Sequence, residues 1–210
     1  MGTERTDQRR EAGQRTRDGL LAAAVKLLAQ RGPDGVSLRE ITDSAGANVS
    51  AVSYHFGSLK ALCDAAIEHA LEQYLDAQIE AVASLDATST VEELAAAFAG
   101  PMIRALAVDG PDLAVMRTVA RAGIDPPKRW DRLASKFDRS RQDVLRVLSA
   151  SQHGIDEQEL VFRTRCAAGL LNWLALAPIG VELATWPAEQ IALWLIPVVA
   201  GTFSGAPSDR

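Results

Sequence analysis

The sequence predicts an all-α protein of about nine helices, organised as a small N-terminal three-helix unit and a larger C-terminal helical bundle. No segment shows a clean alternation of apolar and polar residues bounded by turn residues, so strands are not supported. Apolar residues instead recur at spacings of three and four, and helix-capping residues precede most of these segments. An all-helical fold accounts for both observations.

Length and composition narrow the class of protein further. A chain of 210 residues forms one large domain or two small ones and needs no disulfide or metal to hold its core. Hydrophobic residues make up 48% and charged residues 23%, which excludes wholesale disorder. The apolar runs 166–181 and 191–202 are too short to span a membrane, the N-terminus lacks a signal-peptide pattern, and only two cysteines occur. We therefore expect a cytoplasmic protein with no membrane contact.

Charge is distributed unevenly along the chain. Residues 1–60 hold 9 Lys and Arg against 7 Asp and Glu, whereas residues 61–210 hold 13 against 20. The N-terminal part therefore carries a balance of +2 and the remainder a balance of −7. A polyanion would bind at the mildly basic end.

The first 35 residues combine a polar arm with one amphipathic helix. Residues 1–16 are polar with mixed charge, and we predict a disordered arm there. A helix follows from about residue 17 to residue 31, with Leu20, Ala24, Leu27 and Leu28 on one face. The Gly-Pro-Asp-Gly sequence at 32–35 ends it.

Two short helices are predicted next. Ser37 and Glu40 have the spacing of a capping box, which opens a helix that Gly46 ends. Asn48 caps a further helix that ends near Gly57. Two short helices joined by a few residues containing glycine form a helix-turn-helix pattern.

The longest apolar stripe runs from Ser58 to about Ser84 and predicts a single long helix. At 1.5 Å per residue such a helix spans roughly 35–40 Å, too long for the small N-terminal unit alone. We expect it to begin a second domain, which extends over residues 58–205 and follows a first domain over residues 17–57.

Cap residues mark the remaining helices. Thr90 with Glu93 opens a helix that is interrupted at the Gly-Pro pair 100–101. Asp112 opens another and Asp125 a third. Two more begin at Asp156, which has Glu159 three residues later, and at Pro187.

Residues 35–60 contain the most specific motif of the chain. Arg-Glu-Ile at 39–41, Ala-Gly-Ala-Asn-Val-Ser at 45–50 and Tyr-His-Phe-Gly-Ser at 54–58 follow one another at helix-turn-helix spacing. This stretch resembles the DNA-binding domain of the tetracycline-repressor (TetR-type) family of transcriptional regulators, and the resemblance covers residues from about 17 to 62. It implies a homodimer that binds a duplex operator through a base-reading third helix, with phosphate contacts from the second and fourth helices. The chain departs from the family where a lysine is common at position 59 and a tyrosine at position 53.

The physics of groove recognition selects the same segment. A helix that enters the major groove needs small or hydrogen-bonding side chains, and polar groups beside it can bind phosphate oxygens. Val52 and Phe56 are expected in the core, Asn48 also serves as a helix cap, and His55 has a purely structural alternative. The candidate DNA-binding residues are Ser37, Arg39, Asn48, Val49, Ser50, Ser53, Tyr54, His55 and Lys60.

The C-terminal domain offers a dimer interface and a ligand pocket. Segments 166–177 and 191–200 are apolar nearly all round, so a second subunit is expected to cover them. The candidate interface residues are Leu170, Trp173, Leu174, Leu193, Trp194, Pro197 and Val198. A mainly apolar effector is expected in a pocket that Pro101 helps to open, with Asn172 and His153 as further polar anchors. Its candidate lining residues are Phe98, Met102, Leu106, Met116, Val119, Arg121, Trp130, Phe137 and Trp173.

These patterns favour a repressor that a small molecule releases from a palindromic operator, and two alternatives stay open. One is a redox-sensing regulator that uses Cys63 and Cys166, although both cysteines lie in apolar segments typical of inert thiols. The other is a DNA-binding protein without a ligand, which the acidic C-terminal part disfavours. No catalytic motif, cofactor motif or metal-ligand spacing is present, so we expect neither an enzyme, a cofactor nor a metal site.

Overall fold

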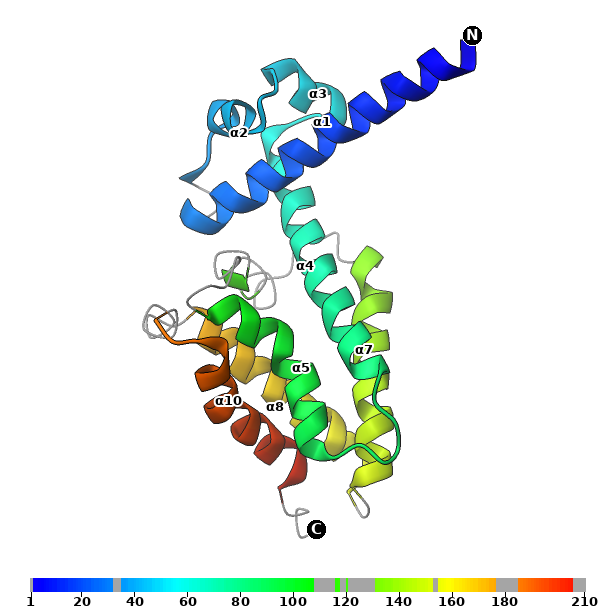
Figure 1. Ribbon diagram of the computed structural model, residues 1–210, viewed down its shortest axis with the longest axis vertical. Coiled ribbons are helices and arrows are strands. Elements are labelled where there is room, and N and C mark those ends of the chain that lie inside the picture. Colours follow the sequence, from blue (N-terminus) through cyan, green and yellow to red (C-terminus); the bar gives the residue numbers. More distant parts are fainter. Residues whose placement is uncertain are drawn as a thin grey trace. The chain divides into compact units, whose positions relative to one another are not determined.

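The computed structural model is α-helical throughout the residues it describes, which are 2–31, 35–107, 116–117, 120, 131–152, 155–176 and 185–205 (Figure 1). No strand occurs among these residues, so the all-α prediction is confirmed. They contain eight helices, and the chain forms two compact units, Met1–Ala70 and Leu71–Arg210. No helix in the described ranges is both long enough and apolar enough to cross a membrane.

The N-terminal unit consists of α1 (Gly2–Arg31), α2 (Leu38–Ala45), α3 (Val49–Phe56) and the first turns of α4 (Leu59–Ala83). Helix α1 packs against both α2 and α3. The residues that form its core share an apolar side chain and near-complete burial, and the largest of the fully buried ones are Leu20, Leu28, Ile41 and Leu62.

The first helix is longer than the sequence predicts. Residues 2–16, expected as a disordered arm, form the first half of α1. Local side-chain contacts along this half support a helix: Arg15 lies 3.9 Å from the Glu11 carboxylate, and the Gln14 amide donates to Asp18 at 2.7 Å. The polar composition of the segment therefore marks a solvated helix and not an arm without structure.

Both short helices begin and end where the sequence predicts. Ser37 caps α2 in a complete capping box with Glu40, and the side chain of Asn48 accepts the N–H of Ala51 to cap α3. Gly46 follows α2 with φ +61° and Gly57 follows α3 with φ +80°. A side chain at either position would be strained, which explains the two glycines.

The border between the two units falls within α4 and not at residues 57 and 58, as the sequence suggested. Leu62, Cys63 and Ala66 are buried in the N-terminal core, with Leu59 packed against it. These turns belong to the N-terminal unit because their apolar side chains are part of its core. The C-terminal unit begins at Leu71.

The C-terminal unit combines the last turns of α4 with α5 (Val91–Leu106), α7 (Asp131–Ser151), α8 (Glu157–Leu176) and α10 (Ala188–Ser204). Helix α10 packs against α5 and α8, and α7 packs against α8 and α5 (Figure 1). Phe98 and Phe203 meet edge to face within this core, with 5.7 Å between ring centroids. The helix starts predicted at Asp112 and Asp125 lie outside the described residues.

Two expectations for this unit require comment. The caps at Thr90 and Asp156 are confirmed: Thr90 forms a capping box with Glu93, and Asp156 accepts the N–H of Glu159 at 2.8 Å. The predicted break in the helix at Pro101 is wrong, because α5 continues through this proline to Leu106. Pro101 is buried among the apolar residues of α5, and packing on both sides of it holds the helix together despite the missing backbone hydrogen bond.

Candidate nucleic-acid interface and cavity

Helix α3 has one buried side and one side open to solvent. Val52 is 1% exposed and anchors the helix in the N-terminal core. On the open side, Val49 is 48% exposed and Tyr54 is 85% exposed, with Ser50 and Ser53 exposed between them. An exposed tyrosine and an exposed valine beside two serines form a surface of small apolar and hydrogen-bonding groups.

The start of α3 is ordered by its own side chains. The Asn48 Oδ1 atom accepts the N–H of Ala51 at 2.9 Å and the hydroxyl of Ser50 at 2.6 Å. The role of Asn48 as a cap is therefore confirmed. Its side-chain NH2 group makes no hydrogen bond within the part of the chain that the structure describes.

The aromatic residues at the end of α3 pack on one another. The His55 ring meets the ring of Tyr54 at 4.9 Å and that of Phe56 at 6.3 Å between centroids. Phe56 packs against the N-terminal core, and the Arg17 guanidinium lies 5.3 Å from its ring centroid. His55 is half-buried in this stack, whereas Tyr54 keeps its hydroxyl side in solvent.

The three predicted phosphate contacts outside α3 all have acidic neighbours. Ser37 donates its hydroxyl to the Glu40 carboxylate at 2.6 Å. Arg39 lies 3.9 Å from Asp43, and the Lys60 ammonium contacts both carboxylate oxygens of Asp64, at 2.9 and 3.1 Å. Sequence inspection missed these pairings, although Arg39–Asp43 and Lys60–Asp64 both have the four-residue spacing of helical ion pairs.

Among the acidic residues that the structure describes in this unit, Glu40 has the largest pKa shift. Hydrogen bonds from the side chain and backbone of Ser37, together with the ion pair to Arg31, lower the pKa of Glu40 from 4.5 to about 2. The carboxylate therefore stays charged at any physiological pH and links α2 to the end of α1.

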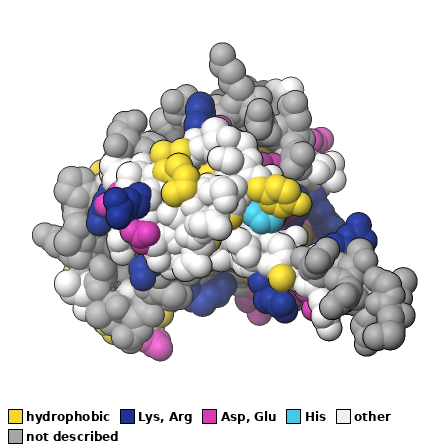
Figure 2. All heavy atoms as spheres, turned by 90° about the horizontal axis from the view of Figure 1, so that it is seen from above, with side chains coloured by type: hydrophobic (Ala, Val, Ile, Leu, Met, Phe, Trp, Pro, Cys, Tyr) yellow, Lys and Arg dark blue, Asp and Glu magenta, His cyan; other side chains and the backbone are white. Residues whose placement is uncertain are grey.

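Figure 2 looks onto the N-terminal unit, which holds α1, α2 and α3, from above the view of Figure 1. The middle of this face shows backbone and uncharged side chains, and side chains of both charges, Lys and Arg as well as Asp and Glu, lie around it. A central area without charged side chains suits a surface that reads bases, and the Lys and Arg among the charged residues at its borders suit phosphate binding.

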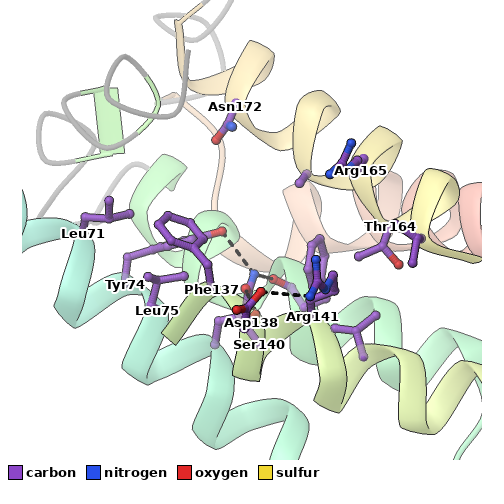
Figure 3. Close-up of a pocket in the computed structure, with 15 residues that line it drawn as sticks. Leu71, Tyr74, Leu75, Phe137, Asp138, Ser140, Arg141, Thr164, Arg165 and Asn172 are labelled. Atoms are coloured by element: carbon purple, nitrogen blue, oxygen red, sulfur yellow. Dashed lines mark hydrogen bonds and ion pairs between the residues drawn. The ribbon is translucent and has the colours of Figure 1, made fainter. Parts of the chain in front are cut away.

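A cavity of about 320 Å³ lies within the C-terminal unit (Figure 3). Helices α4, α5, α7 and α8 line it: Tyr74 and Leu75 of α4 lie on one side, Asn172 and Arg165 of α8 on another, and α7 forms a further wall (Figure 3). The lining is mixed in polarity and comprises Leu71, Tyr74, Leu75, Gln78, Phe98, Phe137, Asp138, Ser140, Arg141, Val144, Val161, Thr164, Arg165, Ala168 and Asn172.

A hydrogen-bonded group of side chains forms one wall of the cavity. Gln78 is 4% exposed; its amide NH2 donates to the Phe98 carbonyl at 3.0 Å and its oxygen accepts the Ser140 hydroxyl at 2.8 Å. The same NH2 group lies 3.4 Å from the Tyr74 hydroxyl oxygen. Burial raises the pKa of Tyr74 to about 12, so its hydroxyl is a neutral donor at neutral pH.

The predicted pocket residues divide into four groups. Phe98, Phe137 and Asn172 line the cavity. Met102, Leu106 and Met116 are buried but are not part of its lining. Trp173 is 56% exposed and is not part of it either. The remaining candidates lie outside the described residues: Val119, Arg121, Trp130 and His153.

Helices α8 and α10 share an exposed apolar face, which we call the α8/α10 face. Its members are large apolar side chains that are about half exposed or more: Phe162, Trp173, Leu193, Trp194 and Val198. Pro197 is also exposed, whereas Leu170 and Leu174 are half-buried. All seven predicted interface residues are thus at least partly accessible.

The two cysteines differ in environment. Cys63 is buried in the N-terminal core, and burial together with the charge of Asp64 raises the pKa of its thiol. Such a thiol is a poor nucleophile and a poor redox sensor. Cys166 is exposed, although the apolar segment around it is typical of a buried, inert thiol. In the described ranges, no three His, Cys, Asp or Glu side chains are grouped where a metal ion could bind.

The N-terminal segment is similar in sequence to known proteins. The family model for bacterial regulatory proteins of the tetR family matches residues 20–66. YttP of Bacillus subtilis, described as a probable HTH-type transcriptional regulator, is 34% identical over 79 residues, which are 38% of each chain. The HTH-type transcriptional repressor NicS of Pseudomonas putida is 33% identical over 78 residues, which are 37% of each chain. Both matches thus span well under half the length of these relatives.

The fold similarity extends further than the sequence similarity. The TetR family transcriptional regulator PfmR from Thermus thermophilus superposes with a TM-score of 0.62, covering 91% of this chain and 99% of that chain at 17% identity. At this identity the likeness establishes the fold: an N-terminal helix-turn-helix followed by a helical bundle.

Proposed function

We propose that the chain is a member of the tetR family of bacterial regulatory proteins, whose model its residues 20–66 match, and that it is a dimeric repressor that a small molecule releases from its DNA operator. This role places it in the cytoplasm, where it binds duplex DNA, and it requires no catalytic step.

The observation that carries the proposal is the exposed side of α3. Val49, Ser50 and Ser53 are small enough for the helix backbone to approach the base edges in a major groove. Tyr54 lies at the border of this surface and can donate its hydroxyl to a phosphate oxygen. Burial of Val52 on the opposite side holds the helix in place for this task.

A second copy of the chain supplies the twofold symmetry that helix-turn-helix proteins use on palindromic sites. The α8/α10 face supports this part of the proposal, because Leu193, Trp194 and Trp173 are large apolar groups left in solvent by one chain alone. Burying such a face against its symmetry mate removes apolar surface from water on both subunits.

The cavity supports the ligand-responsive part of the proposal. Helix α4 supplies Leu62 and Ala66 to the N-terminal core and Tyr74 and Gln78 to the cavity. A ligand that shifts the cavity end of α4 therefore acts on a helix that also contributes to the core in which Val52 of α3 is buried. When the two α3 helices of the dimer no longer match the spacing of successive major grooves, the protein dissociates from the operator.

The decisive test is a charge placed on the open side of α3. Ser53→Glu adds a carboxylate to an exposed position and should abolish binding to every duplex while leaving the thermal unfolding midpoint unchanged. Ser149→Glu, which adds the same charge at an exposed position of α7, serves as the matched control and should bind duplexes as the wild type does. Unchanged DNA binding by Ser53→Glu would refute the assignment of α3.

A further inference from the structure

We propose that the cavity of the C-terminal unit binds a small monocarboxylic acid with an apolar body, whose carboxylate lies at the exposed edge of the cavity that Arg165 of α8 and Arg141 of α7 line. The ligand class follows from the cavity alone, and only the role of this ligand as the effector rests on the proposed function. It replaces the mainly apolar effector that the sequence suggested.

The net charge of the residues that line the cavity indicates the charge of its ligand. Three ionic side chains line the cavity: Asp138, Arg141 and Arg165. They leave one positive charge in excess. Arg165 makes no ion pair or hydrogen bond with any other residue that the structure describes. All three side chains are exposed, so solvent weakens their fields, but the sign of the excess still favours a ligand with one negative charge over an amine.

Arg141 retains capacity for a ligand despite its partner. Its Nη2 group contacts Asp138 at 2.9 Å, a pair three residues apart on α7 (Figure 3). Guanidinium has five N–H donors in a planar fork, and the pair with Asp138 engages one edge of it. A planar carboxylate matches such a fork better than a compact polar group does.

The remaining lining determines the body of the ligand. Leu71, Leu75, Phe98, Phe137, Val144 and Val161 provide an apolar surface around the cavity. The Gln78 amide already has protein partners on both its NH2 group and its oxygen. A ligand therefore does not need polar groups to hydrogen-bond with this wall. A cavity of about 320 Å³ lies toward the lower end of the roughly 300–1,000 Å³ typical of ligand sites. An aliphatic or phenyl-substituted chain of modest length fits this volume and this lining.

The first experiment measures binding to the full-length chain without DNA, by isothermal titration calorimetry. The probes are hexanoate, octanoate, decanoate and hydrocinnamate, each compared with its own primary amide and primary amine. We expect at least one acid to saturate the protein with a Kd below about 1 mM and to bind on the order of 10-fold tighter than its amide. Amides or amines that bind as tightly as the acids, or acids that show no saturation, would overturn the ligand class.

The second experiment assigns the carboxylate to the two arginines. Arg165→Gln and Arg141→Gln should each weaken the acid on the order of 10-fold and leave the amide unchanged. Arg104→Gln removes the same charge from an exposed position of α5 outside the cavity and should change neither. Thermal unfolding midpoints check that all three variants fold. Equal losses for acid and amide would show that the arginines do not bind the carboxylate.

Adding DNA separates this inference from the proposed function. The acid that binds is titrated into a complex of the protein with a fluorescent duplex. Release of the duplex supports both proposals. Binding of the acid without any release refutes the effector role but leaves the ligand class standing.

Discussion

Ser37 and Glu40 form two reciprocal hydrogen bonds at the start of α2. The Glu40 carboxylate accepts the Ser37 N–H at 3.0 Å, and the Ser37 hydroxyl oxygen accepts the Glu40 N–H at 3.3 Å. The same carboxylate pairs with Arg31 at the end of α1. One acidic residue therefore fixes both the first turn of α2 and its link to α1, and α2 in turn packs against α3.

This relationship predicts a pH dependence of stability. The pKa of Glu40 is lowered from 4.5 to about 2, so the folded state favours the charged form. The stabilisation is fully present above about pH 4.5 and is lost as the pH falls toward 2. In thermal unfolding between neutral pH and about pH 3, the difference in midpoint between wild type and Glu40→Gln should shrink in the acid range.

Glu80→Gln is the matched control for this pH series, because Glu80 is exposed on α4. Its difference from wild type should stay small across the range. A Glu40→Gln difference that grows on acidification would contradict the role given to the Glu40 charge.

The elements that the sequence predicted best are those whose start is encoded locally. Capping by Ser37 and Asn48, and termination at Gly46, depend on a few neighbouring residues, and the structure confirms all three. The helix over residues 2–16 was missed because a solvated helix carries no apolar stripe that distinguishes it from a disordered arm.

The cavity was less predictable than the reading helix, since it depends on how four helices pack together. Phe98 and Phe137 were found through their apolar character. Gln78, Ser140, Arg141 and Arg165 were missed, because polar residues on a helix are indistinguishable from a solvated face until their neighbours are known. The spacing of the lining residues along α8 could have indicated them, because residues 161, 165, 168 and 172 form a single stripe on this helix.

The ion pair between Lys60 and Asp64 predicts an unusual gain of function. Asp64→Asn removes a negative charge and frees the Lys60 ammonium for phosphate, so every duplex should bind more tightly with a steeper salt dependence. Lys60→Ala should bind every duplex more weakly, with a salt slope reduced by about one. Fluorescence anisotropy at several salt concentrations measures both.

If the salt dependence of DNA binding were the same in both variants as in the wild type, Lys60 would not be a phosphate-binding residue. Thermal unfolding midpoints serve as the control here, because an exposed ion pair contributes at most about 1 kcal/mol to stability.

The α8/α10 face predicts how the dimer can be separated. Leu193→Glu or Trp194→Glu would bury a carboxylate in an apolar interface, at a cost of several kcal/mol, and should yield monomers. Light scattering coupled to size exclusion measures the mass directly. Ser149→Glu on α7 should remain dimeric, and a wild-type chain that is monomeric at micromolar concentration would contradict the interface.

Release by a ligand predicts a reciprocal effect. If a bound ligand weakens operator binding by some factor, operator DNA must weaken ligand binding by the same factor, typically between about 5- and 150-fold. Titrating the ligand against free and DNA-bound protein gives both values. Equal affinities in the two titrations would show that the cavity and the reading helix are not coupled.

The selection of bound sequences from a random pool of DNA duplexes tests the central claim, that two copies of α3 read DNA as a symmetric pair. The account predicts enrichment of an inverted repeat whose half-site centres lie about 34–36 Å, or roughly 10 base pairs, apart. Substitutions at Val49, Ser50 or Ser53 should change the enriched bases in both halves together, whereas Tyr54→Phe should weaken all sequences alike. Enrichment of a single site without a repeat, or of no sequence at all, would contradict it.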